Sequence, residues 1–305
     1  MTGELVLGAV AYDPKVVTIW EGFRGWLRER DLPFDYVLYS HYERQVEDLV
    51  AGRIGLAWNS PLAWVRASRL ARAAGVRLTP VTMRDTDRDL TSVIVVRGDS
   101  PAQTVADLRG RVIATGAVDS PQATLLPLAL LRGAGLSPVA GLSPGDGGDV
   151  AVRRFDVGVG LHGDHIGGER DAARALAAGE VDAACLLDAS LLLFSREGIL
   201  PVNGTRIVAR TPPYDHCTMT AGPAADPGPA ADPGPAADPG LVSRFGELLL
   251  GMSYADPDLR PLLDLEGLKQ WLPPRLEGYQ QLERAVDQAG FYDARGKIGA
   301  GDYRP

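Results

Sequence analysis

Short apolar runs alternate with longer amphipathic segments through the first half of the chain, and this alternation limits the possible folds most strongly. The apolar runs are expected to be strands and lie at 5–11, 34–39, 54–58, 77–83 and 92–96. Between them, apolar residues recur every three or four positions, as in helices, over 14–30, 42–51 and 62–74. Strands that alternate with helices are typical of parallel sheets with crossover helices. We therefore expect an α/β fold.

The alternation continues in a second unit that begins near Thr91. Its strands are expected at 111–115, 155–160 and 181–187, and its helices at 121–134 and 169–178. A strand at 207–209 then returns toward the first unit, and a helical tail follows from about residue 242. A chain of 305 residues is long enough for two lobes. We expect one lobe from 1–90 plus 208–305 and the other from 91–207, each a mostly parallel sheet flanked by helices.

A low-complexity segment interrupts the C-terminal part. Three copies of the sequence Pro-Ala-Ala-Asp-Pro-Gly run from residue 223 to residue 240, and we take 222–239 as the segment. Such a repeat has too little apolar surface to build a core. We expect a disordered surface insertion in the first lobe, with no catalytic role.

The charge and the N-terminus restrict the partners. A formal net charge of -8 argues against nucleic acid, which requires a basic face. No stretch approaches the ~20 apolar residues of a membrane span, and the N-terminus has no basic segment followed by a long apolar run. We therefore expect a cytoplasmic protein without a membrane span. The two cysteines, Cys185 and Cys217, are too few for a disulfide framework.

Several segments, taken in order, resemble a known family. They lie at 42–65, 92–100, 107–114, 119–124 and 174–185. Their order and spacing are similar to those of the phosphate/phosphonate branch of the type 2 periplasmic-binding-protein superfamily. The resemblance implies two α/β lobes, a two-segment hinge and a cleft that closes over a small polar or anionic ligand. For an exported protein it also implies an ABC permease as partner.

The candidate ligand-binding residues lie mainly where predicted strands end, which is where open α/β sheets bind ligands. Ser120 and Gln122 begin a helix, and its free N–H groups favour an anion. The resemblance implies that this turn holds the acidic group of the ligand, although ordinary helix capping explains the same residues. The full set of candidates is Tyr12, His41, Asn59, Ser60, Ser120, Gln122, His162 and Asp188.

A cluster of histidines and acids just before a predicted helix has three interpretations. His162, His165 and Glu169, with His216 from a second cluster, could hold Zn or Fe. The histidines could instead hydrogen-bond or protonate a substrate. They could also simply cap the helix that begins at Glu169. The spacing matches no standard metal motif, so no cofactor is certain.

Two functions follow from these patterns. The first is a solute-binding protein whose two lobes close over a ligand. The second is a cytoplasmic enzyme on the same fold, with His162, His165, Glu169 and Cys217 as catalytic residues. Beside His216, Cys217 could be an activated thiolate or an inert buried side chain. The cations expected nearest the cleft are Arg97, Arg153, Arg154 and Arg170.

Overall fold

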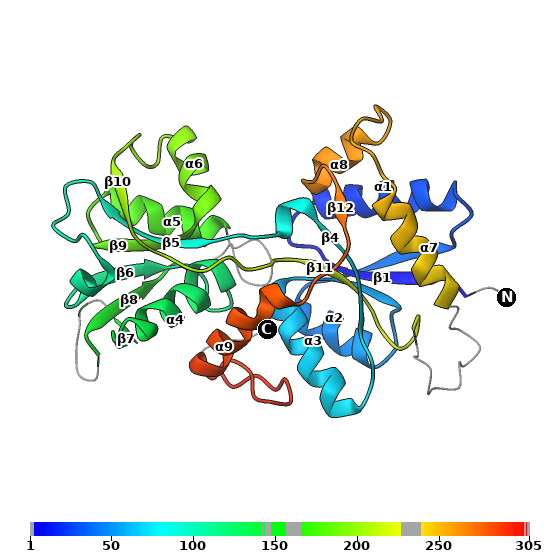
Figure 1. The fold of residues 1–305 in the computed structure, drawn as a ribbon, viewed down its shortest axis with the longest axis horizontal. Coiled ribbons are helices and arrows are strands. Elements are labelled where there is room, and N and C mark those ends of the chain that lie inside the picture. The colour runs from blue at the N-terminus through cyan, green and yellow to red at the C-terminus, as the bar shows by residue number, and fades with distance from the viewer. Residues whose placement is uncertain are drawn as a thin grey trace.

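Two six-stranded sheets form two lobes that lie side by side along the long axis of the molecule (Figure 1). The computed structural model describes residues 3–141, 143, 148–156, 166–226, 239–301 and 303. Helices cover the sheets, as expected for an α/β fold, and the prediction of fold class is confirmed. Among these residues, no helix is both long enough and apolar enough to cross a bilayer.

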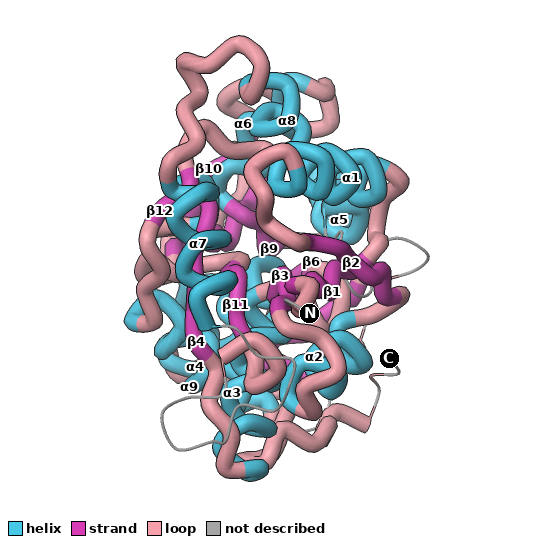
Figure 2. The backbone as a smooth tube through the Cα atoms, turned by 90° about the vertical axis from the view of Figure 1, so that its right-hand side faces the viewer, coloured by secondary structure: helices cyan, strands magenta, loops and turns pink. Residues whose placement is uncertain are grey.

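The first sheet has the strand order β12-β4-β11-β3-β1-β2. Its strands are β1 (Leu5–Val10), β2 (Phe34–Tyr39), β3 (Leu56–Asn59), β4 (Thr79–Arg84), β11 (Thr218–Ala221) and β12 (Trp271–Leu272). The helices of this half are α1 (Lys15–Arg28), α2 (Tyr42–Val50), α3 (Pro61–Ala74), α7 (Pro239–Leu250), α8 (Arg260–Glu266) and α9 (Gln280–Ala289), with short turns η1 (Asp85–Asp87) and η4 (Glu277–Tyr279). Figure 2 shows α1 and α8 on one side of the central strands β1 and β3, and α2 and α3 on the other.

The second sheet has the strand order β10-β5-β9-β6-β8-β7. Its strands are β5 (Ser92–Arg97), β6 (Val112–Thr115), β7 (Pro138–Ala140), β8 (Val150–Arg154), β9 (Ala183–Leu187) and β10 (Thr205–Arg210). The helices are η2 (Val105–Leu108), the π-helix η3 (Pro121–Leu125), α4 (Leu126–Gly133), α5 (Ile166–Ala177) and α6 (Asp188–Arg196).

Each sheet is mixed, because the strands joined by the two connections between the sheets run antiparallel to their neighbours. β1 pairs parallel with β2 and β3, whereas β11 pairs antiparallel with β3 and β4. In the second sheet β6 pairs parallel with β8 and β9, whereas β5 pairs antiparallel with β9 and β10. The chain therefore crosses between sheets twice, from β4 to β5 and from β10 to β11.

The two crossing segments are bonded to each other. Leu90 and Tyr214 exchange two backbone hydrogen bonds of 2.8 Å, and the N–H of His216 donates to the carbonyl of Asp87 at 2.8 Å. The buried Tyr214 hydroxyl lies 3.0 Å from the hydroxyl of Ser92. These contacts make a two-stranded hinge between the lobes.

Some expected elements differ from those observed. The strand placed at 155–160 is wrong at its start, because β8 ends at Arg154 and residues 155 and 156 belong to no element. Residues 157–160 lie outside the described part. β10 belongs entirely to the second sheet, where it pairs with β5, so the boundary drawn between residues 207 and 208 falls inside a strand. The C-terminal part contains β12 as well as helices, because Trp271 and Leu272 pair with the end of β4.

The repeat segment begins as a packed part of the first lobe. Ala225 is 5% exposed and belongs to the main core, and the hydroxyl of Thr79 donates to Asp226 at 2.5 Å. Pro239, at the other end, is the first residue of α7. The expectation of disorder is therefore wrong at 222–226, because this stretch packs against the sheet, while residues 227–238 lie outside the described residues.

Candidate ligand-binding site

A cavity of about 80 Å³ lies at the junction of the two lobes. Pro121 comes from the second lobe, and the other lining residues come from the first lobe and the hinge. The lining residues are Tyr12, Tyr42, Trp58, Ser60, Pro61, Arg84, Pro121, His216 and Cys217. The volume suits a small ligand, since a water molecule takes up about 30 Å³ of liquid.

Two similar Ser-Pro turns reach this cavity from opposite lobes. Ser60 caps α3, and its hydroxyl accepts from the N–H of Ala63 at 3.2 Å. Ser120 caps η3, and its hydroxyl accepts from the N–H of Ala123 at 3.1 Å. In each turn a proline occupies the first helical position. Helix N-termini attract anions through their N–H groups and dipoles, so the two turns can act on one bound anion.

Aromatic rings form the walls of the cavity. Trp58 is 8% exposed and also packs edge-on against Trp271, with ring centroids 5.8 Å apart. Burial raises the pKa of Tyr42 well above its ordinary value, so its hydroxyl keeps its proton and can donate to a ligand. Tyr12 is 42% exposed and lies at the mouth.

Arg84 is the cation of the cavity. Its Nε and Nη2 donate to the two carboxylate oxygens of Asp87 at 2.6 and 2.9 Å, and its Nη1 lies 3.3 Å from Oε1 of Glu266. Its guanidinium also lies over the ring of Trp58, 5.2 Å from the centroid. Burial opposes both charges of the Arg84–Asp87 pair, but their mutual attraction prevails, raising the pKa of Arg84 and lowering that of Asp87.

Two carboxylates, those of Asp87 and Glu266, contact Arg84 beside the cavity. Burial raises the pKa of Glu266 to about 7. The positive charge of Arg84 lowers this pKa and the negative charge of Asp87 raises it, but burial has the largest effect. Sequence reasoning missed all three of these charged residues. Arg84 directly follows the predicted strand 77–83 and Asp87 lies three residues beyond Arg84, so their position after a strand was an available signal. Glu266 comes from α8, far along the chain, and no sequence signal marked it.

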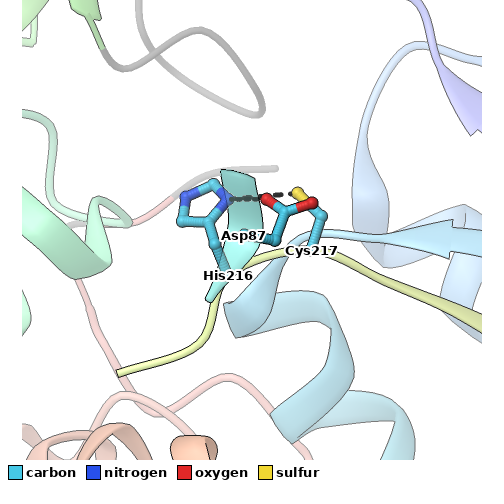
Figure 3. A group of neighbouring side chains, drawn as sticks. All are labelled: Asp87, His216 and Cys217. Atoms are coloured by element: carbon cyan, nitrogen blue, oxygen red, sulfur yellow. Dashed lines mark hydrogen bonds and ion pairs between the residues drawn. The ribbon is translucent and has the colours of Figure 1, made fainter. Parts of the chain in front are cut away.

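His216 and Cys217 line the cavity beside Asp87 (Figure 3). Nδ1 of His216 lies 3.1 Å from Sγ of Cys217 and 3.5 Å from Oδ1 of Asp87. One ring nitrogen faces both neighbours, whereas a nucleophile triad uses both nitrogens of the imidazole. Burial, together with the charge of Asp87, raises the pKa of Cys217 well above its ordinary value. The arrangement therefore does not favour an activated thiolate.

Several other candidates perform structural roles away from the lining. Nδ1 of His41 caps α2 by accepting from the N–H of Arg44 at 3.4 Å. Asn59 is fully buried at the end of β3 and accepts from the side chain of Gln45 at 3.1 Å. Gln122 is buried in the first turn of η3. Of the predicted ligand-binding residues, Tyr12 and Ser60 line the cavity, and Ser120 precedes the lining residue Pro121.

The acidic candidates of the second lobe are also held by that lobe. The buried carboxylate of Glu169 accepts from the N–H of Leu187 at 2.8 Å. Asp188 begins α6 and is paired with Arg210. Among the described residues, His216 groups with Asp87 and Cys217 as potential metal ligands and not with Glu169. His162 and His165 lie outside the described residues.

The four arginines expected near the cleft do not line this cavity. Each is paired with an acid of its own lobe, and the pairs are Arg97–Asp99, Arg153–Glu180, Arg154–Asp156 and Arg170–Glu197. The expectation is corrected because the crossing segment, not the second lobe, supplies the cation. Spacing along the chain does not reveal which arginines are already paired.

Several solved structures have a fold similar to that of this chain. XAC2383 from Xanthomonas citri bound to ATP has a TM-score of 0.66 at 20% identity, over 94% of this chain and 98% of that one. PhnD1 from Prochlorococcus marinus in complex with methylphosphonate has a TM-score of 0.63 at 16% identity, over 94% and 98%. The periplasmic aliphatic sulphonate binding protein SsuA from Escherichia coli has a TM-score of 0.56 at 20% identity, over 100% and 93%. At these identities the similarity shows the two-lobed fold.

The family is given by a sequence model described as ABC transporter, phosphonate, periplasmic substrate-binding protein, which matches residues 9–279. No curated protein matches the chain. The model supports the solute-binding interpretation over the enzyme, and it implies a small-molecule ligand and a permease partner. It also overturns the expected cytoplasmic location, because its members are periplasmic. The chain belongs to the phosphonate family of periplasmic substrate-binding proteins of ABC transporters.

Proposed function

We propose that this protein binds a small phosphonate- or phosphate-type anion in the cavity between its lobes and delivers it to an ABC permease. The observation that carries the proposal is the pair of Ser-Pro turns, Ser60-Pro61 and Ser120-Pro121, which approach one cavity from opposite lobes. An anion held by both helix N-termini would draw the lobes together, which is how ligand binding drives closure in two-lobed proteins.

The walls supply the remaining contacts. The protonated hydroxyl of Tyr42 can donate to an oxyanion, and Ser60 accepts through its lone pair, so its own proton is available to a ligand. The rings of Tyr12 and Trp58 suit a short organic substituent. Because Asp87 and Glu266 lie behind Arg84, the helix N-termini would carry most of the attraction for the anion.

Similar structures support the same class of ligand. The PhnD1 structure holds methylphosphonate, and SsuA is named as an aliphatic sulphonate binder. Both ligands place a tetrahedral oxyanion on a small apolar group, which fits a cavity with two helix N-termini and aromatic walls.

A thermal-shift panel tests this proposal. The purified chain is heated with methylphosphonate, phosphate or methanesulfonate, and with ethylamine and acetamide as cationic and neutral controls of similar size. A ligand at 100 times its dissociation constant stabilises the folded state by about 2.7 kcal/mol. That corresponds to a rise in Tm of about 5 °C for a chain of this size.

The panel also separates alternatives. We expect the rise with at least one tetrahedral anion and with neither control. A rise in Tm with ethylamine alone, or the absence of any rise with all three anions, would contradict the proposed ligand class.

A further inference from the structure

Three potential metal ligands from the two hinge crossings converge at the wall of the cavity (Figure 3). Asp87 belongs to the crossing from β4 to β5, and His216 and Cys217 belong to the crossing from β10 to β11. We propose that these three residues bind a divalent metal ion of the zinc type. The inference goes beyond the proposed function, since it does not depend on which anion enters the cavity.

The separations of the donor atoms fit one tetrahedral ion. Zinc binds a thiolate at about 2.3 Å and an imidazole nitrogen or a carboxylate oxygen at about 2.0–2.2 Å, which places tetrahedral ligands about 3.5 Å apart. Nδ1 of His216 lies 3.1 Å from Sγ of Cys217 and 3.5 Å from Oδ1 of Asp87, and the three atoms all lie within 4.8 Å of one another. Both distances from Nδ1 of His216 are therefore within a few tenths of an ångström of the tetrahedral value.

The chemistry of the donors also points to zinc. A thiolate, an imidazole and a carboxylate form a mixed set that suits Zn²⁺ and disfavours Mg²⁺ or Ca²⁺, which prefer oxygen alone. Three protein ligands leave a fourth position. Because His216 and Cys217 line the cavity, that position opens into it, where water or an oxygen of a bound anion can enter.

The backbone holds the three ligands together without a metal. The N–H of His216 donates to the carbonyl of Asp87 at 2.8 Å, and residues 90 and 214 pair just beyond. Nε and Nη2 of Arg84 donate hydrogen bonds to the two carboxylate oxygens of Asp87, at 2.6 and 2.9 Å. Such an outer partner fixes the orientation of a ligating carboxylate, which retains further lone pairs for the metal.

The charges of the buried wall balance when the ion is present. Arg84 contacts two carboxylates, those of Asp87 and Glu266. A divalent ion deprotonates a coordinating thiol. Three positive charges, from the ion and Arg84, then face three negative charges, from Asp87, Glu266 and Cys217. The negative charges of the carboxylates and the thiolate thus offset the charge of the ion and its repulsion from Arg84.

The competing interpretation is a plain hydrogen bond from the thiol of Cys217 to Nδ1 of His216. Cobalt distinguishes the two, because Co²⁺ occupies zinc sites and a bound thiolate gives it an intense charge-transfer band in the near ultraviolet. The full chain is treated with a chelator, freed of it, and titrated with Co²⁺ alone. We expect one equivalent to bind with this band and Zn²⁺ to displace it.

Matched variants locate the site. Cys217→Ser should abolish the band, whereas Cys185→Ser, at the other buried cysteine in β9, should retain it. His216→Gln should weaken Co²⁺ binding at least tenfold. The His216 side chain is 24% exposed, so this variant should fold even if Cys217→Ser does not, which circular dichroism checks. Any one of three results would contradict the proposed metal site. They are the absence of a thiolate band in the folded wild type, a band that persists in Cys217→Ser, and an unchanged Co²⁺ affinity in His216→Gln.

Discussion

At the scale of single residues, Ser60 combines a structural and a functional role. Its hydroxyl accepts from Ala63 to cap α3 and at the same time lines the cavity. Ser68, on the same helix, donates to the carbonyl of Trp64 at 2.9 Å and does not line the cavity. Ser68 therefore serves as a control for the loss of a serine hydroxyl from this helix.

We predict that Ser60→Ala weakens anion binding about tenfold or more, because a hydrogen bond to a charged group contributes about 1.5–3 kcal/mol. Loss of the cap should also lower stability by about 1 kcal/mol. Ser68→Ala should leave the affinity unchanged. Calorimetric titrations of both variants check this, and equal affinities for Ser60→Ala and wild type would exclude contact with the anion.

A second residue-scale prediction concerns pH. Burial raises the pKa of Glu266 to about 7 from an ordinary 4.5, so the folded state binds a proton more tightly than the unfolded state. The stability that this group contributes is therefore complete below pH 4.5 and is lost as the pH rises to about 7, a loss on the order of 3 kcal/mol.

Replacing the carboxyl group of Glu266 should abolish this loss of stability with rising pH. In chelator-treated protein, Glu266→Gln should gain stability over wild type at pH 8 and match it more closely at pH 5. The exposed Glu247→Gln should show no such difference between the two pH values. Denaturant unfolding at each pH measures it, and an identical effect of Glu266→Gln at pH 5 and pH 8 would refute the assignment.

The helix starts at Ser60 and Ser120 were predicted correctly from the sequence, whereas their contact with a ligand stays a prediction. Ser60 and Ser120 were identifiable because a Ser-Pro pair after a predicted strand begins a helix. Glu266 was not, because it reaches Arg84 from a distant helix and only the tertiary fold brings them together. The set of metal ligands predicted from the clustered histidines likewise did not include Asp87. Asp87 comes close to His216 only because the two hinge segments pack against each other.

At the scale of elements, α9 ties the lobes together. Leu282 and Val286 share one apolar cluster with Leu62 and Val65 of α3 and with Leu126 of α4. The helix thus contacts helices of both lobes.

We predict that Leu282→Ala, at a side chain only 1% exposed, costs about 2–5 kcal/mol of stability. Gln288→Ala, on the exposed face of α9, should cost far less. Denaturant unfolding measures both. Similar small losses in the two variants would show that α9 does not pack as described.

Strong periodicity made most elements of the first half predictable. The strand 34–39 and the helix that begins at Tyr42 occur as expected. β8 and β12 could not be predicted in place, because β8 is a short run beside a Gly- and Asp-rich loop and β12 has two residues. Such short strands are stabilised by the neighbours they pair with, β6 and β7 or β4, rather than by their own sequence.

At the scale of the whole molecule, both ends of the repeat segment are anchored in the first lobe. Ala225 and Leu241 belong to the same apolar cluster and line the same surface pocket. The two ends therefore lie near each other, and a shorter connection can join them.

We predict that deleting residues 227–238, which removes two repeat copies and joins Asp226 to Pro239, changes stability by less than about 1 kcal/mol, because closure entropy varies slowly with loop length. The longer deletion of 223–238 should be clearly destabilising, since it removes the buried Ala225 and the Thr79–Asp226 bond. Thermal unfolding compares the two. Equal losses would show that the packing at 222–226 contributes nothing.

The central claim is that one small oxyanion binds between the two lobes, and titration calorimetry with methylphosphonate tests it most directly. We predict one site per chain with a dissociation constant of about 1 μM or tighter, equivalent to at least about 8 kcal/mol. Absence of binding heat at several temperatures, for methylphosphonate and equally for phosphate and methanesulfonate, would contradict the account.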